Sequence, residues 1–178
     1  TLQELMTAVS LIQPEEKERI SKFVFQEDFK GSLGGRLLMR HFVKCALCID
    51  NDRFKLGRDE NNKPHLNAID GLSNNQACDF NVSHQGSYAC LAGCVGNDST
   101  AHQRLGVDVM KIEYGGGKPL QEFFRLMTRN FSSNEWAYIK SFNSEQRQLR
   151  AFMRNWCLKE SYVKNVGIGI TMNLQKLD

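Results

Sequence analysis

The sequence predicts an α+β protein, in which runs of helix and runs of strand follow one another along 178 residues. Apolar residues recur at helical spacing towards both ends of the chain, and short β-rich segments bounded by turn residues lie between them. The length suffices for one good hydrophobic core or two small ones. With 41% hydrophobic and 24% charged residues, the composition is that of a folded globular protein.

Two helices are predicted in the N-terminal part of the chain. Pro14 and the two glutamates after it place a proline in the first turn and acidic groups at the positive end, which predicts a helix from Pro14 to about Phe25. The glycines of Gly31–Gly35 are expected to interrupt helical structure, and a second helix runs from Gly34 to about Ile49. Residues 50–72, rich in Asn, Asp, Gly and charge, predict irregular or weakly stranded structure.

Three strands are predicted in the middle of the chain. Phe80–His84 and Tyr88–Ala92 flank a short Gln-Gly-Ser link, which is typical of a hairpin. A polar loop follows over Gly96–Arg104, and Leu105–Ile112 predicts a third strand. We expect the three strands to form a meander.

The second half is predicted to be mainly helical. A helix over Pro119–Phe131 is followed by one over Ser132–Phe142, which opens with a Ser-x-x-Glu capping box. A long helix then runs from Ser144 to Val166 and ends at Gly167.

One further strand is predicted over Ile168–Met172, just before the chain ends. The second half then has far less sheet than its helices need, and Thr1 stands where an initiator methionine would be. We therefore expect the chain to be a fragment that lacks its last strands.

Charge and apolar content indicate a cytosolic protein. The net charge of +3 fits a phosphorylated ligand or an acidic partner but is too weak to indicate nucleic acid. No apolar run approaches the ~20 residues that span a bilayer. Charged residues interrupt the opening segment, so we expect no secretory signal there. The six cysteines are accordingly expected to be free thiols. A four-cysteine zinc site from Cys45-x-x-Cys48 and Cys90-x-x-x-Cys94 is an alternative, although neither pair has zinc-ribbon spacing.

Two charged residues stand beside the apolar stripe of the long C-terminal helix. At about 100° per residue, Glu160 and Lys164 fall in one arc with Met153, Trp156 and Val163, while arginines take the opposite face. A carboxylate among core residues needs a cation. Lys164, one turn further on, would supply it in a structural ion pair. In the alternative interpretation, Glu160 is a metal ligand or a base.

A second carboxylate, Asp108, stands in the predicted third strand on the face that also carries Met110 and Ile112. Asp108 and Glu160 would converge on one Mg²⁺, which is commonly held by one or two carboxylates together with phosphate and water. Taken alone, Asp108 is equally consistent with a strand-end residue bonded to backbone amides.

Fixed positive charge for a phosphate is available from Arg36, Arg58, Lys63 and His84, although each is unremarkable by itself. The sequence contains neither the Gly-x-x-x-x-Gly-Lys-Ser/Thr order of a P-loop nor the Gly-x-Ser-x-Gly of a serine hydrolase.

Three motifs together resemble the 4′-phosphopantetheinyl transferases of the surfactin-synthetase type. They are Phe80-Asn-Val-Ser-His84, Gly106-Val-Asp-Val-Met110 and Trp156-Cys-Leu-Lys-Glu-Ser-Tyr-Val-Lys164, in this order. The stretch 122–136 is similar to the eukaryotic members that act on aminoadipate-semialdehyde dehydrogenase, so the resemblance covers nearly the whole chain.

The resemblance implies a pseudo-twofold pair of similar halves, each a small, mainly antiparallel sheet packed with helices. Residues 1–105 would form the half that contacts the phosphates of coenzyme A, and residues 106–178 the half with the metal and catalytic motif. Coenzyme A and Mg²⁺ would lie in the cleft between the halves. A monomer with internal pseudo-symmetry is expected.

The resemblance also implies roles for single residues. Asp108 and Glu160 match the magnesium ligands, and Lys164 matches the lysine that closes the helix motif. All three are expected to be catalytic, and Glu160 and Lys164 to contact coenzyme A as well. Further coenzyme A contacts are expected from Arg36, Arg58, Lys63, Asn81, Val82, Ser83 and His84.

The implied reaction moves the phosphopantetheine arm of coenzyme A to a serine of an apo carrier protein and releases adenosine 3′,5′-bisphosphate. Carriers of the acyl carrier protein, fatty acid synthase and aminoadipate-semialdehyde dehydrogenase types are the expected partners. Lys164 would offset charge on the leaving group, and Glu160 is either the base or only a metal ligand. Met110 departs from the family, since many relatives carry an acid there. The alternative function is a non-catalytic module that binds a nucleotide or a carrier protein.

Overall fold

The computed structural model describes residues 1–69, 77–96, 104–167 and 172–177. Its helices are α1 (Leu2–Ser10), α2 (Pro14–Ser21), α3 (Gln26–Leu47), α4 (Leu120–Leu126), α5 (Ser133–Lys140) and α6 (Glu145–Val166), with short 3₁₀ turns η1 (Thr128–Asn130) and η3 (Leu174–Lys176). Its strands are β1 (Leu56–Arg58), β2 (Pro64–Leu66), β3 (Ala77–Gln85) and β4 (Tyr88–Gly96). They pair antiparallel, β1 with β2 and β3 with β4. The predicted α+β class is confirmed.

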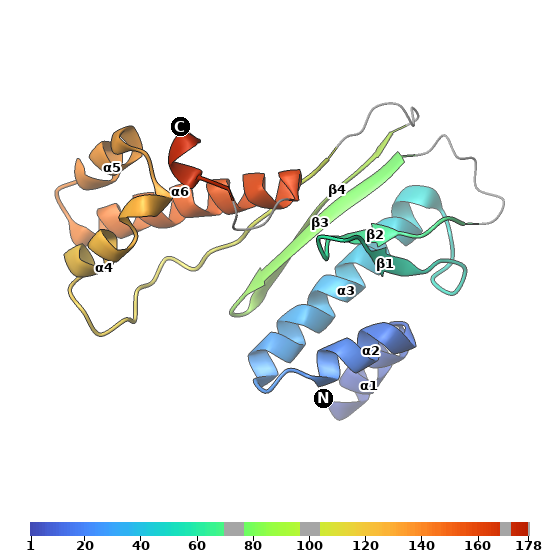
Figure 1. Cartoon of the computed structure of the whole chain (residues 1–178). Coiled ribbons are helices and arrows are strands. Elements are labelled where there is room, and N and C mark those ends of the chain that lie inside the picture. Colours follow the sequence, from blue (N-terminus) through green and yellow to red (C-terminus); the bar gives the residue numbers. More distant parts are fainter. Residues whose placement is uncertain (70–76, 97–103, 168–171, 178) are drawn as a thin grey trace.

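The elements gather on two sides of the long β3–β4 hairpin. Figure 1 shows α1, α2, α3 and the β1–β2 hairpin on one side, and α4, α5 and the first turns of α6 on the other. The C-terminal end of α6 reaches back towards the hairpin (Figure 1). This return of α6 brings its last turns close to residues of the first half.

The N-terminal helices differ from the prediction in extent. α1 was not predicted, although Thr1-x-x-Glu4 forms a capping box, with the Glu4 amide donating to Thr1 Oγ1 at 3.3 Å. α2 begins at Pro14 as predicted and ends at Ser21. Both helices pack on α3 through a small core of Ile12, Ile20 and Leu33.

The predicted interruption at Gly31–Gly35 is wrong, because these glycines lie inside α3. A Cβ on Gly35 would stand 3.0 Å from Val82 Cγ2, and one on Gly31 would stand 2.6 Å from His84 Nδ1. The glycines therefore let α3 approach β3 closely. Burial against the strand outweighs their poor helix propensity, roughly 1 kcal/mol each.

The predicted hairpin is confirmed, and both strands extend further than expected. Asn81 pairs with Ala92 and Gln85 with Tyr88. Phe80, on the face towards α3, is fully buried in the core of the first half. This core also contains Met39, Val43, Ile49, Phe54 and Leu56.

The predicted third strand and the meander are wrong, since within the described residues the segment 104–111 joins no backbone ladder. Its amides are taken by side chains of β3. The Leu105 amide donates to Asp79 Oδ2 at 2.6 Å and the Val107 amide to Asn81 Oδ1 at 2.8 Å. Further along, the Lys111 amide donates to the side-chain oxygen of Gln85.

The odd-numbered residues Asp79, Asn81, Ser83 and Gln85 share one face of β3, which we call the polar face of β3. This face holds the segment 104–111 against the hairpin without adding a strand to the sheet.

The C-terminal helices largely match the prediction. Ser132 and Glu135 cap α5 reciprocally, with bonds of 2.7 and 3.1 Å, and α6 spans Glu145–Val166 and ends at Gly167 with φ 77°. The helix predicted over Pro119–Phe131 is shorter, since α4 stops at Leu126 and η1 follows.

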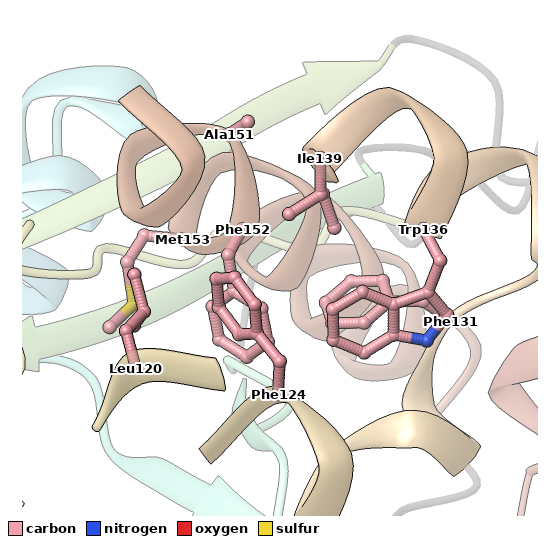
Figure 2. Packing of buried hydrophobic residues seen from close by; sticks show 8 residues of the cluster. All are labelled: Leu120, Phe124, Phe131, Trp136, Ile139, Ala151, Phe152 and Met153. Carbon is pink, nitrogen blue, oxygen red and sulfur yellow. The ribbon is translucent and has the colours of Figure 1, made fainter. Parts of the chain in front are cut away.

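An aromatic core joins α4, α5 and α6. Figure 2 shows Phe124, Phe131, Trp136 and Phe152 packed together between these helices. The rings of Phe124 and Phe152 stack with centroids 5.3 Å apart. The second half thus has a core of its own, separate from those of the first half.

The cysteines, the possible metal ligands and the helix lengths can be compared with the predictions. All six cysteines are free. Across the described ranges, no group of three or more His, Cys, Asp or Glu side chains is arranged to hold a metal. None of the helices that the structure describes has the length and apolar character needed to cross a bilayer.

Most of the predicted loop over Gly96–Arg104 and of the strand over Ile168–Met172 lies outside the described residues.

Candidate functional site

A cavity of about 420 Å³ opens where the end of α6 meets the first half. Its wall includes charged or titratable side chains from four elements: Arg36 of α3, Arg58 of β1, His84 of β3, and Glu160 and Lys164 of α6. Further wall residues are Arg19, Phe23, Lys63, Asn81, Val82 and Val163. The cavity therefore draws on both halves of the chain, and its wall carries both signs of charge.

Arginines provide the positive wall. Arg36 is 4% exposed, and its Nη1 donates to the carbonyl oxygen of Ser32 at 2.9 Å. Its Nε lies 3.8 Å from Glu16 Oε1 and has no hydrogen-bond partner in the described structure. Burial lowers the pKa of Arg36, and the nearby Arg19 charge acts in the same direction. For Arg58, burial and the charges of Arg19 and Arg36 lower the pKa to about 10.

This clustering of like charges is unfavourable in an empty cavity and favourable for an anion. A phosphate would add negative charge to the cavity and relieve the mutual repulsion of the arginines. The positive wall thus has the chemistry of a phosphate site.

Lys63 also reaches the cavity wall, but its charge is already paired. Lys63 Nζ lies 2.9 Å from Asp79 Oδ2, which also accepts from the Leu105 amide. Lys63 is therefore less available to an anion than Arg58.

The motif Asn81–His84 is split between the two faces of β3. Val82 and His84 lie towards α3 and line the cavity, and Asn81 lines it while accepting from the Val107 amide. Ser83 is not among the wall residues and is 7% exposed. Of the four predicted contacts, Ser83 alone is absent from the cavity wall.

Asp108 and Lys164 form the tightest ion pair of the site. Lys164 Nζ lies 2.6 Å from Asp108 Oδ1, and it also donates to Ser83 Oγ at 2.9 Å and to the Val107 carbonyl at 3.3 Å. Ser83 Oγ donates to the same Asp108 Oδ1 at 2.7 Å. The Asp108 side chain is only 7% exposed.

Glu160 lies next to this pair without joining it. Of the two interpretations of Glu160, the structural ion pair with Lys164 is not formed, because within the described residues Lys164 is bridged to Asp108 and Glu160 has no ion pair within 4.0 Å. Burial raises the pKa of Glu160, the Asp108 charge raises it further, and the Lys164 charge lowers it. The two carboxylates are thus within electrostatic reach of each other, and the charge of one lysine acts on both.

The donor set fits a divalent cation. Asp108 Oδ2 is buried and has no hydrogen-bond partner among the described atoms. A buried carboxylate oxygen without a donor is unfavourable unless a cation meets it. Together with Glu160 it offers the hard oxygen ligands that Mg²⁺ prefers, beside a cavity with room for phosphate.

Two structural features of the site were not predicted. A Cβ on Gly106 would stand 1.9 Å from the Ser161 carbonyl oxygen, so only glycine lets the segment 104–111 pass α6. Lys159 is 4% exposed and lies 2.7 Å from Glu135 Oε2, away from the cavity. The lysine beside Glu160 therefore anchors α6 to α5, and no sequence signal separates its role from that of Lys164.

Comparison with known families gives two adjoining matches. Residues 1–96 match the family described as “4′-phosphopantetheinyl transferase, N-terminal”. Residues 104–178 match the “4′-phosphopantetheinyl transferase superfamily”.

Individual relatives agree with these families. The L-aminoadipate-semialdehyde dehydrogenase-phosphopantetheinyl transferase of Mus musculus is 43% identical over 98% of this chain, and that of Homo sapiens is 42% identical over 98%. The chain covers 54% of each, so it spans about half the length of these relatives. The 4′-phosphopantetheinyl transferase Sfp of Bacillus subtilis is 28% identical over 93% of the chain, which covers 65% of that protein.

Proposed function

Because this chain belongs to the 4′-phosphopantetheinyl transferases, we propose that it transfers the phosphopantetheine arm of coenzyme A to a serine of an apo carrier protein. The carrier serine oxygen bonds to the phosphorus that bears the pantetheine arm, and the diphosphate bond to the nucleotide breaks. The serine proton passes to a base, and adenosine 3′,5′-bisphosphate leaves with the electron pair.

The observation that supports this proposal is that the wall of one cavity carries both positively and negatively charged side chains. Arg36, Arg58 and His84 from the first half face the same hollow as Glu160 and Lys164 from the second. Coenzyme A carries three phosphate groups, one on the ribose and two in the reacting diphosphate, so it needs fixed positive charge at one end and a charge-balanced reaction centre at the other.

Asp108 and Glu160 are the proposed ligands of Mg²⁺, supported by the unpartnered oxygen of Asp108 and the raised pKa of Glu160. A bound Mg²⁺ would neutralise diphosphate charge as the bond to the leaving group breaks.

The other roles fall to side chains of the chain itself. Arg36, Arg58 and His84 bind phosphate oxygens, with Lys63, Asn81 and Val82 completing the wall around the substrate. Lys164, 30% exposed at its side chain, presents its charge where the leaving group departs.

Glu160 is a candidate base for the serine proton. A raised pKa makes a carboxylate a stronger proton acceptor, as general base catalysis requires. The same carboxylate also serves as a metal ligand, and the proposal includes both roles.

We also propose that residues 1–105 and 106–178 are two halves of a pseudo-twofold molecule that acts as a cytosolic monomer. Two features support the division. Each half has its own hydrophobic core, and each contains one 22-residue helix, α3 and α6, that contributes to the cavity.

The test is an intact-mass measurement on the full-length protein incubated with coenzyme A, Mg²⁺ and several apo carrier proteins. Carriers of the acyl carrier protein, fatty acid synthase and aminoadipate-semialdehyde dehydrogenase types are compared. We expect one carrier at least to gain the mass of one phosphopantetheine, and a carrier with its acceptor serine changed to alanine to gain none.

Reactions without Mg²⁺ and with chelator serve as controls. If coenzyme A binds but no carrier gains mass, the chain is instead a non-catalytic binding module.

A further inference from the structure

Ser83 is the residue of the motif Asn81–His84 that does not line the cavity. It is 7% exposed and lies on the polar face of β3, which it shares with Asn81. Its hydroxyl meets the Asp108–Lys164 pair instead of the hollow.

The Ser83 hydroxyl both donates and accepts a hydrogen bond. Its single proton goes to Asp108 Oδ1 at 2.7 Å, and one of its lone pairs accepts from Lys164 Nζ at 2.9 Å. Lys164 donates to the same Oδ1 at 2.6 Å. One oxygen of Asp108 therefore receives two donors, while the buried Oδ2 receives none.

We propose that Ser83 is a positioning residue for Asp108. By fixing Oδ1, its hydroxyl sets the rotation of the carboxylate and keeps Oδ2 available to a divalent cation. This inference rests on the proposed function only for the identity of the cation as Mg²⁺. It differs from the role that the resemblance implies, in which Ser83 contacts coenzyme A.

Lys164 alone fixes the carboxylate poorly. An ammonium group is a point charge with rotatable donors, and the terminal torsion of an aspartate side chain has a broad energy well. Ser83 comes from a strand in the middle of a regular antiparallel ladder, where Ser83 pairs with Cys90. Its short side chain therefore holds the hydroxyl oxygen in one place. The hydrogen bond from this hydroxyl then gives the Asp108 carboxylate a defined orientation, which the ion pair with Lys164 alone does not.

The experiment compares Ser83→Ala, Ser83→Cys and Ser83→Thr with the unaltered full-length protein. Cysteine keeps the size of serine but is a weak donor, and threonine keeps the hydroxyl and is favoured in strands. Ser87→Ala changes an exposed serine of the same hairpin and is the matched control. Circular dichroism melting shows which variants are folded.

The first measurement is Mn²⁺ binding to each protein without coenzyme A, followed by electron paramagnetic resonance. Ser83→Ala and Ser83→Cys are expected to bind Mn²⁺ about tenfold more weakly, which corresponds to the loss of one hydrogen bond to a charged group. Ser83→Thr and Ser87→Ala are expected to bind close to the unaltered value.

The second measurement is calorimetric binding of coenzyme A in the presence of chelator. All variants are expected to bind it equally, because Ser83 does not line the cavity. The inference is overturned if Ser83→Ala and Ser83→Cys weaken coenzyme A binding and leave Mn²⁺ binding unchanged, or if the unaltered protein does not bind Mn²⁺.

Carrier modification by the unaltered protein separates this inference from the proposed function. If carriers are modified while the alanine and cysteine variants keep their Mn²⁺ affinity, the positioning role alone fails. If no carrier is modified but both variants lose Mn²⁺ affinity, the transferase proposal alone fails.

Discussion

At the scale of single residues, the site is governed by a buried imbalance of charge. Asp108 and Glu160 are negative, Lys164 is positive, and one oxygen of Asp108 is buried without a donor. One ammonium group offsets only part of the charge of two carboxylates. The protein thus keeps a destabilising arrangement of charges, which a bound cation and an anionic substrate would stabilise.

Replacing Asp108 by asparagine tests this balance directly. Asp108→Asn keeps the shape of the side chain but removes its charge, so we expect carrier modification to slow by about 10²–10³-fold, as for loss of one electrostatic catalytic group. Initial rates of mass transfer at saturating coenzyme A provide the measurement. Glu113→Gln is the control, because the Glu113 side chain is 61% exposed. Near-normal rates for Asp108→Asn would contradict the assigned role.

Glu160 should make the metal-free protein less stable as pH rises. Its pKa in the fold lies above the ordinary value of 4.5, so the folded state holds this proton more tightly than the unfolded state. Its contribution is present at low pH and is lost as pH rises from about 4.5 through the folded pKa.

We therefore expect the melting temperature of the unaltered protein, relative to Glu160→Gln, to fall as the pH rises above 4.5. Thermal melts in chelator measure it. A constant difference across this range would show that Glu160 is not desolvated.

At the scale of elements, the segment 104–111 lies between β3 and α6 and contacts both. Side chains of the polar face of β3 hold one side of it, and the backbone of α6 presses on the other at Gly106. The Asn165 side chain donates to the Arg104 carbonyl, and Arg104 donates to the Val166 carbonyl at 3.1 Å. The position of Asp108 is thus set by packing from both sides.

Gly106→Ala tests that packing. The added Cβ would meet the Ser161 carbonyl oxygen at 1.9 Å, and backbone must shift to relieve it. We expect a loss of about 1–3 kcal/mol in the free energy of unfolding, as for overpacked cores, with lower transferase activity. Chemical denaturation measures the loss. Gly115→Ala is the matched control, since its Cβ would meet nothing within 4 Å.

At the scale of the whole molecule, two bodies with separate cores meet at one cavity. The first half supplies the arginines and His84, and the second supplies the end of α6. A ligand that fills the cavity touches both and should hold them together, because binding to the folded state alone stabilises everything that forms the site.

Hydrogen exchange with and without coenzyme A examines this coupling. We expect slower exchange in two distant stretches at once, around Arg58–Lys63 and around Glu160–Gly167. Residues 133–140 of α5, which do not line the cavity, serve as the internal control. Protection confined to the first stretch would show that α6 does not take part in binding.

The sequence alone determined the features that depend on local chemistry. Local signals identified the starts of α2 and α5, and Gly167 identified the end of α6. Alternation and turn residues identified the β3–β4 hairpin. The misplaced charges at Asp108 and Glu160 were visible as well, because a carboxylate in an apolar pattern is detectable without coordinates.

Only the tertiary structure decided which groups meet. It paired Lys164 with Asp108 instead of Glu160, kept Gly31–Gly35 inside α3, and held 104–111 by side chains in place of a ladder. In each case a contact between segments far apart in the chain outweighed a local preference. Such contacts depend on where two surfaces pack, and this information is not contained in the spacing of residues along one segment.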